Sequence, residues 1–274
     1  MLELELYVYI ALFGLAGGFL AGLLGIGGGL LYIIVLPTIA ERLFVPEVQI
    51  AQFTIANSLF ATMLASATAV YTHFRNGNFF WRESMLIGFS AILSSSLIIV
   101  FIVNQPFYST KIFNWMLIVI LIYMASITLF RLFSNSASPL NNKLGSGPSL
   151  LIGTSGGITA PLTGLGGSLV MIPLMVNWRH IDMKKAAVVA NGVVFIQSLS
   201  SSVINTFFSP NAHSVIKLQT GFILWPVAAV LGISVVISSP LGAIWSRKLP
   251  SRKLSIGFLV LLIGVLFKKI LEVL

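Results

Sequence analysis

The sequence contains no cysteine, and this absence excludes several kinds of chemistry. A chain without thiols forms no disulfide, offers no thiol nucleophile and holds no iron–sulfur cluster or zinc–thiolate site. The sequence also lacks a Gly-x-x-x-x-Gly-Lys-Ser/Thr phosphate loop, and it has no His/Asp/Glu cluster with the spacing of a metal or acid–base site. We therefore expect no enzyme and no cofactor, and ATP-driven transport by this chain alone is disfavoured.

Charged residues are scarce as well. Only 8% of the 274 residues are charged, against about 25% in an ordinary soluble domain, whereas 57% are hydrophobic. Apolar runs long enough to cross a bilayer recur along the chain, and they do not alternate with the period of two that a membrane barrel requires. The composition therefore predicts an all-α integral membrane protein whose helices contact membrane lipid.

The net charge of +9 comes from basic residues in short segments between the apolar runs. In a soluble protein such an excess would suggest a nucleic-acid partner. In a membrane protein, the positive-inside bias of cytoplasmic loops explains it. We therefore expect a multi-pass protein of the cell (cytoplasmic) membrane with no nucleic-acid partner.

A glycine-rich segment occurs twice in the chain. Residues 25–30 read Gly-Ile-Gly-Gly-Gly-Leu, and residues 164–169, which follow 139 positions later, read Gly-Leu-Gly-Gly-Ser-Leu. The pair Gly17-Gly18 returns at the same offset as Gly156-Gly157. Glycine-interrupted apolar segments at matching places in two halves are typical of the binding site of a duplicated transporter.

Eight apolar elements divide into two homologous halves of four. We predict residues 1–133 as the first membrane repeat, 134–149 as a polar linker rich in Ser, Asn, Pro and Gly, and 150–274 as the second repeat. The predicted elements cover 6–39, 48–71, 85–103 and 112–133 in the first half, and 150–178, 185–208, 218–245 and 254–271 in the second.

The first and fifth elements are too long for one crossing and too short for two, because about thirty helical residues span about 45 Å against a hydrocarbon core of about 30 Å. We expect breaks at Gly25–Gly29 in the first, and at Pro161, Gly164–Gly167 and Pro173 in the fifth. If the first and fifth elements are re-entrant hairpins, eleven of the 16 Lys and Arg residues lie on one side of the membrane and five on the other. If all eight elements cross the membrane once, the division is nine to seven. The positive-inside bias favours the hairpins, which make the halves inverted repeats.

In these motifs the chain resembles the TauE/SafE family of sulfite and organosulfonate exporters. The resemblance rests on the two glycine motifs and on a polar residue in the helix that follows each, and it covers nearly the whole chain. The copies differ at Ser168, where the first half has Gly29, and at Pro161, where it has Gly22. The resemblance implies a transporter of a small anion and leaves the substrate open.

No Lys, Arg, Asp or Glu lies deep inside a predicted span, so an anion must be held without a buried counter-charge. Helices that restart near Leu30 and Leu169 would aim unpaired N–H groups and the positive ends of their dipoles at one central site. Asn57 and Asn191 recur at similar places in the next helices, where amides can donate to an anion. The predicted substrate-binding residues are Gly25, Gly27, Gly28, Gly29, Gln52, Asn57 and Ser58 in the first half and Gly164, Gly166, Gly167, Ser168, Asn191 and Gln197 in the second.

Each of these signals has a plainer interpretation. Small residues let membrane helices pack closely, and amides in membrane helices often bond to a neighbouring helix. For the duplicated glycine cluster we favour a functional break. For the amides both interpretations stay open.

The sequence thus predicts a secondary transporter or facilitator that exports a small sulfur-containing anion, such as sulfite, thiosulfate or an organosulfonate, across the cytoplasmic membrane. The alternatives are an uptake transporter for another small anion, and a membrane enzyme or assembly subunit without transport activity. The anion, the direction, any coupling ion and the oligomeric state stay open at this point.

Overall fold

The computed structural model describes residues 4–133, 144–208 and 218–273, and it is helical almost throughout. The first half contains α1 (Leu4–Leu24), α2 (Gly29–Arg42), the short 3-10 helix η1 (Glu47–Gln49), α3 (Ile50–Arg75), α4 (Trp81–Ile98), the π-helical turn η2 (Ile99–Val103) and α5 (Thr110–Phe133). The second half contains α6 (Ser146–Thr163), α7 (Ser168–Pro173), the π-helical turn η3 (Leu174–Trp178), α8 (Met183–Phe207), α9 (Trp225–Lys248) and α10 (Ser251–Val273). Two short antiparallel strands, β1 (Gln219–Thr220) and β2 (Ile223–Leu224), precede α9.

Seven helical segments in the described part of the chain are long and apolar enough to cross a membrane, and they contain α1, α3, α4, α5, α8, α9 and α10. Their outer faces carry large apolar side chains. On α4, Phe89, Leu93 and Leu97 follow one another at a spacing of four residues, and each is more than half exposed. The all-α membrane fold predicted from the composition is confirmed.

The helices of the two halves are interleaved. α1 packs along α9 of the second half, and α6 packs in the same way along α4 of the first. α3 and α8 are in contact at the centre, and α5 packs against α10. α3 and α8 occupy the same place in their halves, and so do α5 and α10. The pair α1–α9 corresponds to the pair α6–α4 with the two halves exchanged. The buried apolar core contains residues of both halves.

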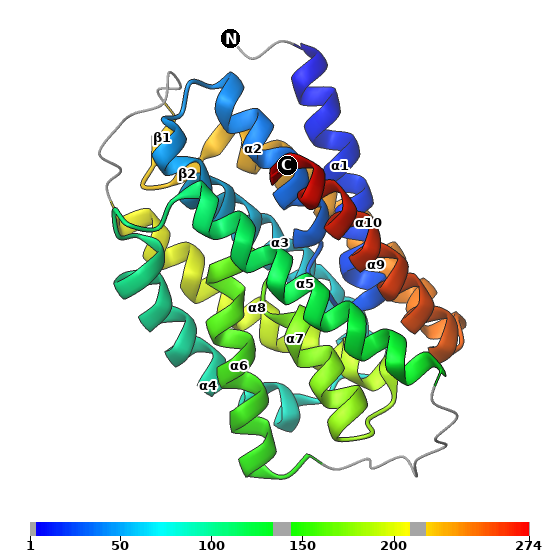
Figure 1. Cartoon of the computed structure of the whole chain (residues 1–274). Helices are drawn as coiled ribbons and strands as arrows, with labels where there is room; N and C mark the ends of the chain where they lie inside the picture. Colours follow the sequence, from blue (N-terminus) through cyan, green and yellow to red (C-terminus); the bar gives the residue numbers. More distant parts are fainter. Residues whose placement is uncertain (1–3, 134–143, 209–217, 274) are drawn as a thin grey trace.

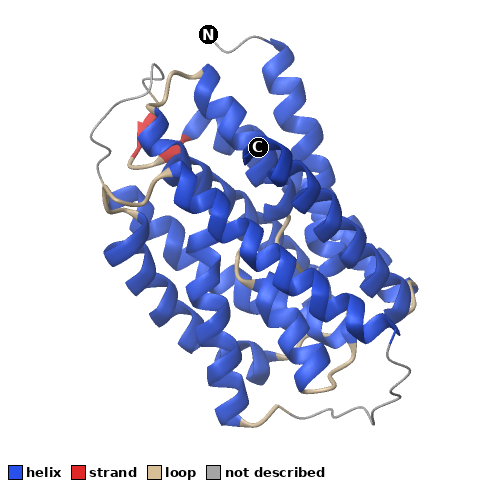
Figure 2. Cartoon of the chain, viewed as in Figure 1, coloured by secondary structure: helices blue, strands red, loops and turns tan. Residues whose placement is uncertain are grey.

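Two hairpins point into the molecule from opposite ends (Figure 1). α1 runs inward from the end where the N-terminus lies, and α2 returns to that end, whereas α6 and α7 start from and return to the other end. Figure 2 shows the loops that join each pair as tan segments in the interior. The helices break at Gly25–Gly28 and at Gly164–Gly167, as the glycine pattern predicts.

The prolines act differently from the prediction. Pro161 lies in the last turn of α6 without interrupting it, because the chain turns only at Gly164, which has a left-handed conformation. Pro173 ends α7, but the chain continues in the π-helical turn η3 to Trp178. The fifth element is therefore broken once.

Two helices begin at other residues than predicted. α6 begins at Ser146, inside the range predicted as linker, of which residues 134–143 lie outside the described part. The seventh element begins at Trp225 and not at Leu218, because residues 219–224 form the β1–β2 hairpin. Gly221, with φ of +57°, makes the turn, and the proline after Trp225 disfavours helix before it.

The two ends of the molecule differ in charge. One, which we call the basic end, is where α3 and α9 finish and α4, α8 and α10 begin (Figure 1). Contacts between Lys185 and Glu83, between Lys184 and the Arg247 carbonyl, and between Ser251 and Asp182 hold these termini together. The described cations of the basic end are Arg75, Arg82, Arg179, Lys184, Lys185, Arg247, Lys248, Arg252 and Lys253, against the carboxylates Glu83 and Asp182.

The membrane side of each end is a prediction. The positive-inside bias places the basic end in the cytoplasm and the end of Arg42 outside. Because the chain has no native cysteine, single variants Arg42→Cys and Lys184→Cys can be labelled with an impermeant maleimide. We expect Arg42→Cys to react in intact cells and Lys184→Cys only after permeabilisation, with Lys248→Cys behaving like Lys184→Cys. Labelling of both positions from one side would contradict the hairpin arrangement.

Candidate functional site

The two helix breaks have the same backbone conformation. Three glycines in each loop have positive φ angles, which an L-residue adopts at a cost of roughly 1–2 kcal/mol. The angles are +74°, +70° and +75° at Gly25, Gly27 and Gly28, and +72°, +71° and +75° at Gly164, Gly166 and Gly167. The sequence repeat is therefore a repeat of one specific loop.

The two loops meet at the centre of the molecule. A methyl group added at Gly29 would lie 2.7 Å from the Gly164 carbonyl oxygen, so the backbones are in direct contact. Methyl groups added at Gly27 and at Gly166 would both strike Thr62 of α3 and Val194 of α8. The predicted convergence of the two glycine clusters is present, and α3 and α8 close around it.

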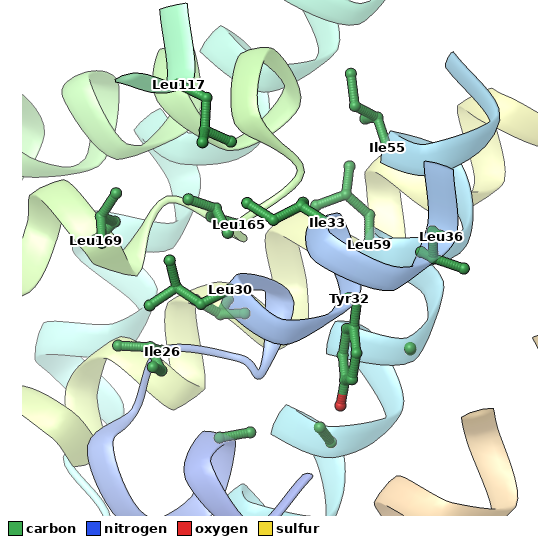
Figure 3. Packing of buried hydrophobic residues seen from close by; sticks show 14 of the residues in the cluster. Ile26, Leu30, Tyr32, Ile33, Leu36, Ile55, Leu59, Leu117, Leu165 and Leu169 are labelled. Carbon is green, nitrogen blue, oxygen red and sulfur yellow. The ribbon is translucent and has the colours of Figure 1, made fainter. Parts of the chain in front are cut away.

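Apolar side chains of the loops seal this contact. Figure 3 shows Ile26 and Leu30 of the first hairpin near Leu165 and Leu169 of the second, and all four are at most 2% exposed. The ring of Tyr32 is directed away from them. The loops thus present apolar side chains to one another and leave their polar backbone as the remaining functional surface.

Each loop also closes onto the inward helix of its own hairpin. A methyl group at Gly28 would lie 2.5 Å from the Gly17 carbonyl oxygen and 2.6 Å from the Tyr32 hydroxyl. A methyl group at Gly167 would strike the Gly156 carbonyl in the same way. The position that corresponds to Tyr32 holds Met171, so the two loops have different side chains at this place.

Two hydroxyls hold the carbonyls at the end of α6. The Tyr108 hydroxyl donates to the Leu162 carbonyl at 2.6 Å, and the Ser58 hydroxyl donates to the Gly164 carbonyl at 2.7 Å. Burial raises the pKa of the Tyr108 phenol above its usual range, so it stays a neutral donor. Ser58, a predicted site residue, therefore lies at the centre but binds a loop carbonyl.

Two predicted site amides serve as structural ties. Asn57 donates to the Phe53 and Phe222 carbonyls and accepts from the Leu224 N–H, which fastens the β1–β2 hairpin to α3. Gln52 donates to the Val103 and Tyr108 carbonyls. For these two residues the plainer interpretation, hydrogen bonding within the fold, describes the structure.

Other predicted residues have buried polar atoms without partners. Asn191 is fully buried, and neither its amide oxygen nor its amide nitrogen has a hydrogen-bond partner. The Ser168 hydroxyl at the start of α7 is likewise buried and unpaired. Gln197 makes one long contact of 3.5 Å to the Gly156 carbonyl, and its amide oxygen has none. Buried polar atoms are normally hydrogen-bonded, so these unpaired groups are the candidates for contact with a polar ligand.

The sequence reasoning missed two hydroxyls of α3. Thr62 and Ser66 follow Ser58 at four-residue spacing, so the three lie on one face. Both are buried without a partner, whereas Thr68 and Thr72 bond to carbonyls of their own helix. The four-residue spacing from Ser58 is the signal that could have found them. The site therefore offers neutral donors and no buried charge.

The chain is similar to known membrane transporters. A family model described as "Sulfite exporter TauE/SafE" matches residues 10–268. A probable membrane transporter protein of Methanocaldococcus jannaschii is 27% identical over 260 residues, which cover 93% of each chain. A probable membrane transporter protein of Haemophilus influenzae is 28% identical over 268 residues, which cover 95% of this chain and 97% of the relative. No solved structure matches the chain.

The loop geometry predicts an order of stability for two glycine variants. Gly164→Ala should cost about 1 kcal/mol, because its methyl group would find ordinary contacts of 3.4 Å or more and only φ is unfavourable. Gly28→Ala should cost clearly more, because its methyl group would also meet the Gly17 carbonyl. Thermal unfolding in detergent measures the difference, with Gly257→Ala, which meets nothing within 4 Å, as the control. Equal stability of all three would contradict the loop structure.

Alanine variants of Asn57 and Asn191 should differ in stability in the same thermal unfolding assay. Asn57→Ala removes three hydrogen bonds and leaves buried backbone groups of the β1–β2 hairpin unpaired, at about 1–3 kcal/mol for each orphaned group. Asn191→Ala removes an amide that has no partner, so the apparent melting temperature should stay the same or rise. A larger loss of stability in Asn191→Ala than in Asn57→Ala would refute these assignments.

Proposed function

The chain belongs to the sulfite exporter TauE/SafE family, and from that premise we propose that it exports a small sulfur-containing anion such as sulfite, thiosulfate or an organosulfonate. It is a multi-pass membrane transporter, in agreement with its two relatives. The substrate passes through the centre of the molecule, where the two glycine loops meet between α3 and α8.

The observation that supports this route is the meeting of two helix starts at one place. α2 begins at Gly29 and α7 at Ser168, and the first N–H groups of a helix have no acceptor within it. The Tyr32 hydroxyl lies beside Gly28, the Ser168 hydroxyl belongs to the first residue of α7, and Thr62 touches Gly27 and Gly166 with its methyl group. All three hydroxyls are unpaired. Backbone and hydroxyl donors of this kind suit the oxygens of a sulfite or sulfonate group, which accept hydrogen bonds and donate few.

The neutrality of the site serves transport. A buried arginine or lysine would hold an anion tightly, whereas passage requires that the substrate also leave. Donor N–H groups and the positive ends of two helix dipoles stabilise negative charge more weakly, by up to about 2 kcal/mol for a partly buried helix terminus. The site can therefore bind and release an anion without a change in its own charge.

Substrate binding requires a rearrangement of the centre. In this structure Thr62 and Val194 fill the space against Gly27 and Gly166. We place the anion where these side chains now touch the loops, after α3 and α8 have moved relative to the hairpins. Rocking of one structural unit against another around a fixed site is the usual form of such motion in duplicated transporters.

The membrane potential is a sufficient driving force for export. A cell with a negative interior expels a monovalent anion with about 2.3 kcal/mol for each 100 mV. Flux should therefore appear in proteoliposomes loaded with sulfite, thiosulfate or sulfoacetate when a potential is imposed without a pH gradient. Flux of none of these anions under a potential, a proton gradient or a sodium gradient would reject the proposal.

The hydroxyl donors provide a specific test of the route. We expect Thr62→Val and Ser66→Ala each to lower potential-driven flux roughly 10- to 100-fold, because a hydrogen bond to a charged group contributes about 1.5–3 kcal/mol. The control is Ser126→Ala on α5, whose exposed hydroxyl bonds to the Ile122 carbonyl of its own helix. Unchanged flux in both α3 variants, with normal amounts of folded protein, would move the route away from this face.

A further inference from the structure

A cavity opens at the basic end, away from the glycine loops. It has a volume of about 320 Å³, near the lower limit for small-molecule sites, and it lies between the end of α3, the start of α8 and the end of α9. His73 and Ser246 line it as buried residues, and Lys184, Lys185 and Arg247 line it as cations. Nothing in the proposed central site accounts for this cavity.

His73 is the unusual member of this lining. Its side chain is 1% exposed, and neither ring nitrogen has a hydrogen-bond partner. A buried imidazole without a partner loses the hydrogen bonds that water would give it. In a cavity bordered by cations, an anion that accepts a hydrogen bond from the ring N–H would remove the part of this penalty that belongs to the donor nitrogen.

The cationic groups are incompletely neutralised by protein carboxylates. Lys185 pairs with Glu83 at 2.9 Å, and its ammonium group lies 4.5 Å from the centre of the Phe80 ring. In the described part of the chain, no carboxylate lies within ion-pair distance of Lys184 or Arg247.

The single acid in the cavity lining, Asp182, is already engaged. It caps α8 by accepting from the Lys184 N–H, and it accepts from the Ser251 hydroxyl. Two cations therefore face the cavity without a carboxylate partner. A bound anion would give these two cations a partner of opposite charge.

Unpaired polar side chains lie between the cavity and the centre on α3 and α8. On α3, His73 shares a helix face with Ser66 and Thr62, at separations of seven and eleven residues. On α8, Asn191 lies three residues beyond Val188, which lines the cavity. The polar side-chain atoms of His73, Ser66, Thr62 and Asn191 are all buried without partners. On α3 they follow one helix face from His73 in the cavity to Thr62, which touches the glycine loops.

We propose that this cavity is a second binding site, which takes an oxyanion or sulfonate group at the basic end before the group moves to the central loops. Lys184 and Arg247 attract the anion, and His73 donates a hydrogen bond at the inner wall. That the bound anion is the transported one rests on the proposed function. The binding site itself does not.

The absence of native cysteine allows a direct test in purified protein. The variant Ser246→Cys places a thiol in the cavity with little change of shape, and Asn76→Cys places one on the exposed surface of the same end. Each thiol is labelled with the anionic 2-sulfonatoethyl methanethiosulfonate and with its cationic trimethylammonium analogue. Sulfoacetate is the protecting anion, and gluconate at equal concentration is the control.

We expect the anionic reagent to modify Ser246→Cys at least fivefold faster than the cationic one, and sulfoacetate to slow this reaction at least fivefold. Both effects should disappear when Lys184→Gln and Arg247→Gln are added. They should persist when Lys248→Gln and Lys253→Gln are added, which remove two charges of the same end that do not line the cavity. The Asn76→Cys thiol should show no protection. Val188→Cys, at a residue that also lines the cavity and donates nothing to the anion, gives an independent thiol if Ser246→Cys folds poorly.

The outcomes separate the second site from the proposed function. Protection that is absent, or equal for the cavity and surface thiols, or lost equally with either charge pair, overturns the second site even if the wild-type protein transports anions. Protection that depends on Lys184 and Arg247 supports the second site even if reconstituted protein shows no flux, in which case the transport proposal alone fails. A thiol at residue 246 that reacts with neither reagent shows the cavity to be closed and also overturns the site.

Discussion

The structure depends on one constraint: backbone polar groups inside a membrane need partners, and here two helices stop halfway through the molecule. Such breaks are tolerated where protein covers them or where they line a water-filled cavity. The two glycine loops cover each other, with Gly29 against Gly164, and α3 and α8 enclose both through Thr62 and Val194. The exchange of partners between the halves, α1 with α9 and α6 with α4, places both loops at the same depth.

Within that frame the polar residues of α3 and α8 fall into two groups. Gln52, Asn57 and Ser58 bind backbone carbonyls and hold neighbouring segments in place. Thr62, Ser66 and Asn191 are buried without partners. The first group makes the centre rigid, whereas the second is costly to the fold unless something else uses it. This contrast is the physical reason to place a substrate beside the second group.

The two halves differ at positions close to the two loops. Asn57 fastens the β1–β2 hairpin, whereas its counterpart Asn191 has no partner. Tyr32 brings a phenol to the first loop where the second has Met171. The concentration of cations at one end adds a further asymmetry, which gives an anion a preferred side of approach. Two loops of the same backbone conformation thus have different surroundings.

The sequence by itself determined the membrane class and the two helix breaks at the glycine clusters, because composition and the conformational freedom of glycine are local properties of the chain. It also indicated that charge stays out of the spans. Only the tertiary structure decided which amides are free, because Asn57 and Asn191 look alike until the β1–β2 hairpin is seen to occupy one of them. The same holds for Thr62 and for the cavity of His73: a hydrogen-bond partner, or its absence, is a property of segments that lie far apart in the chain.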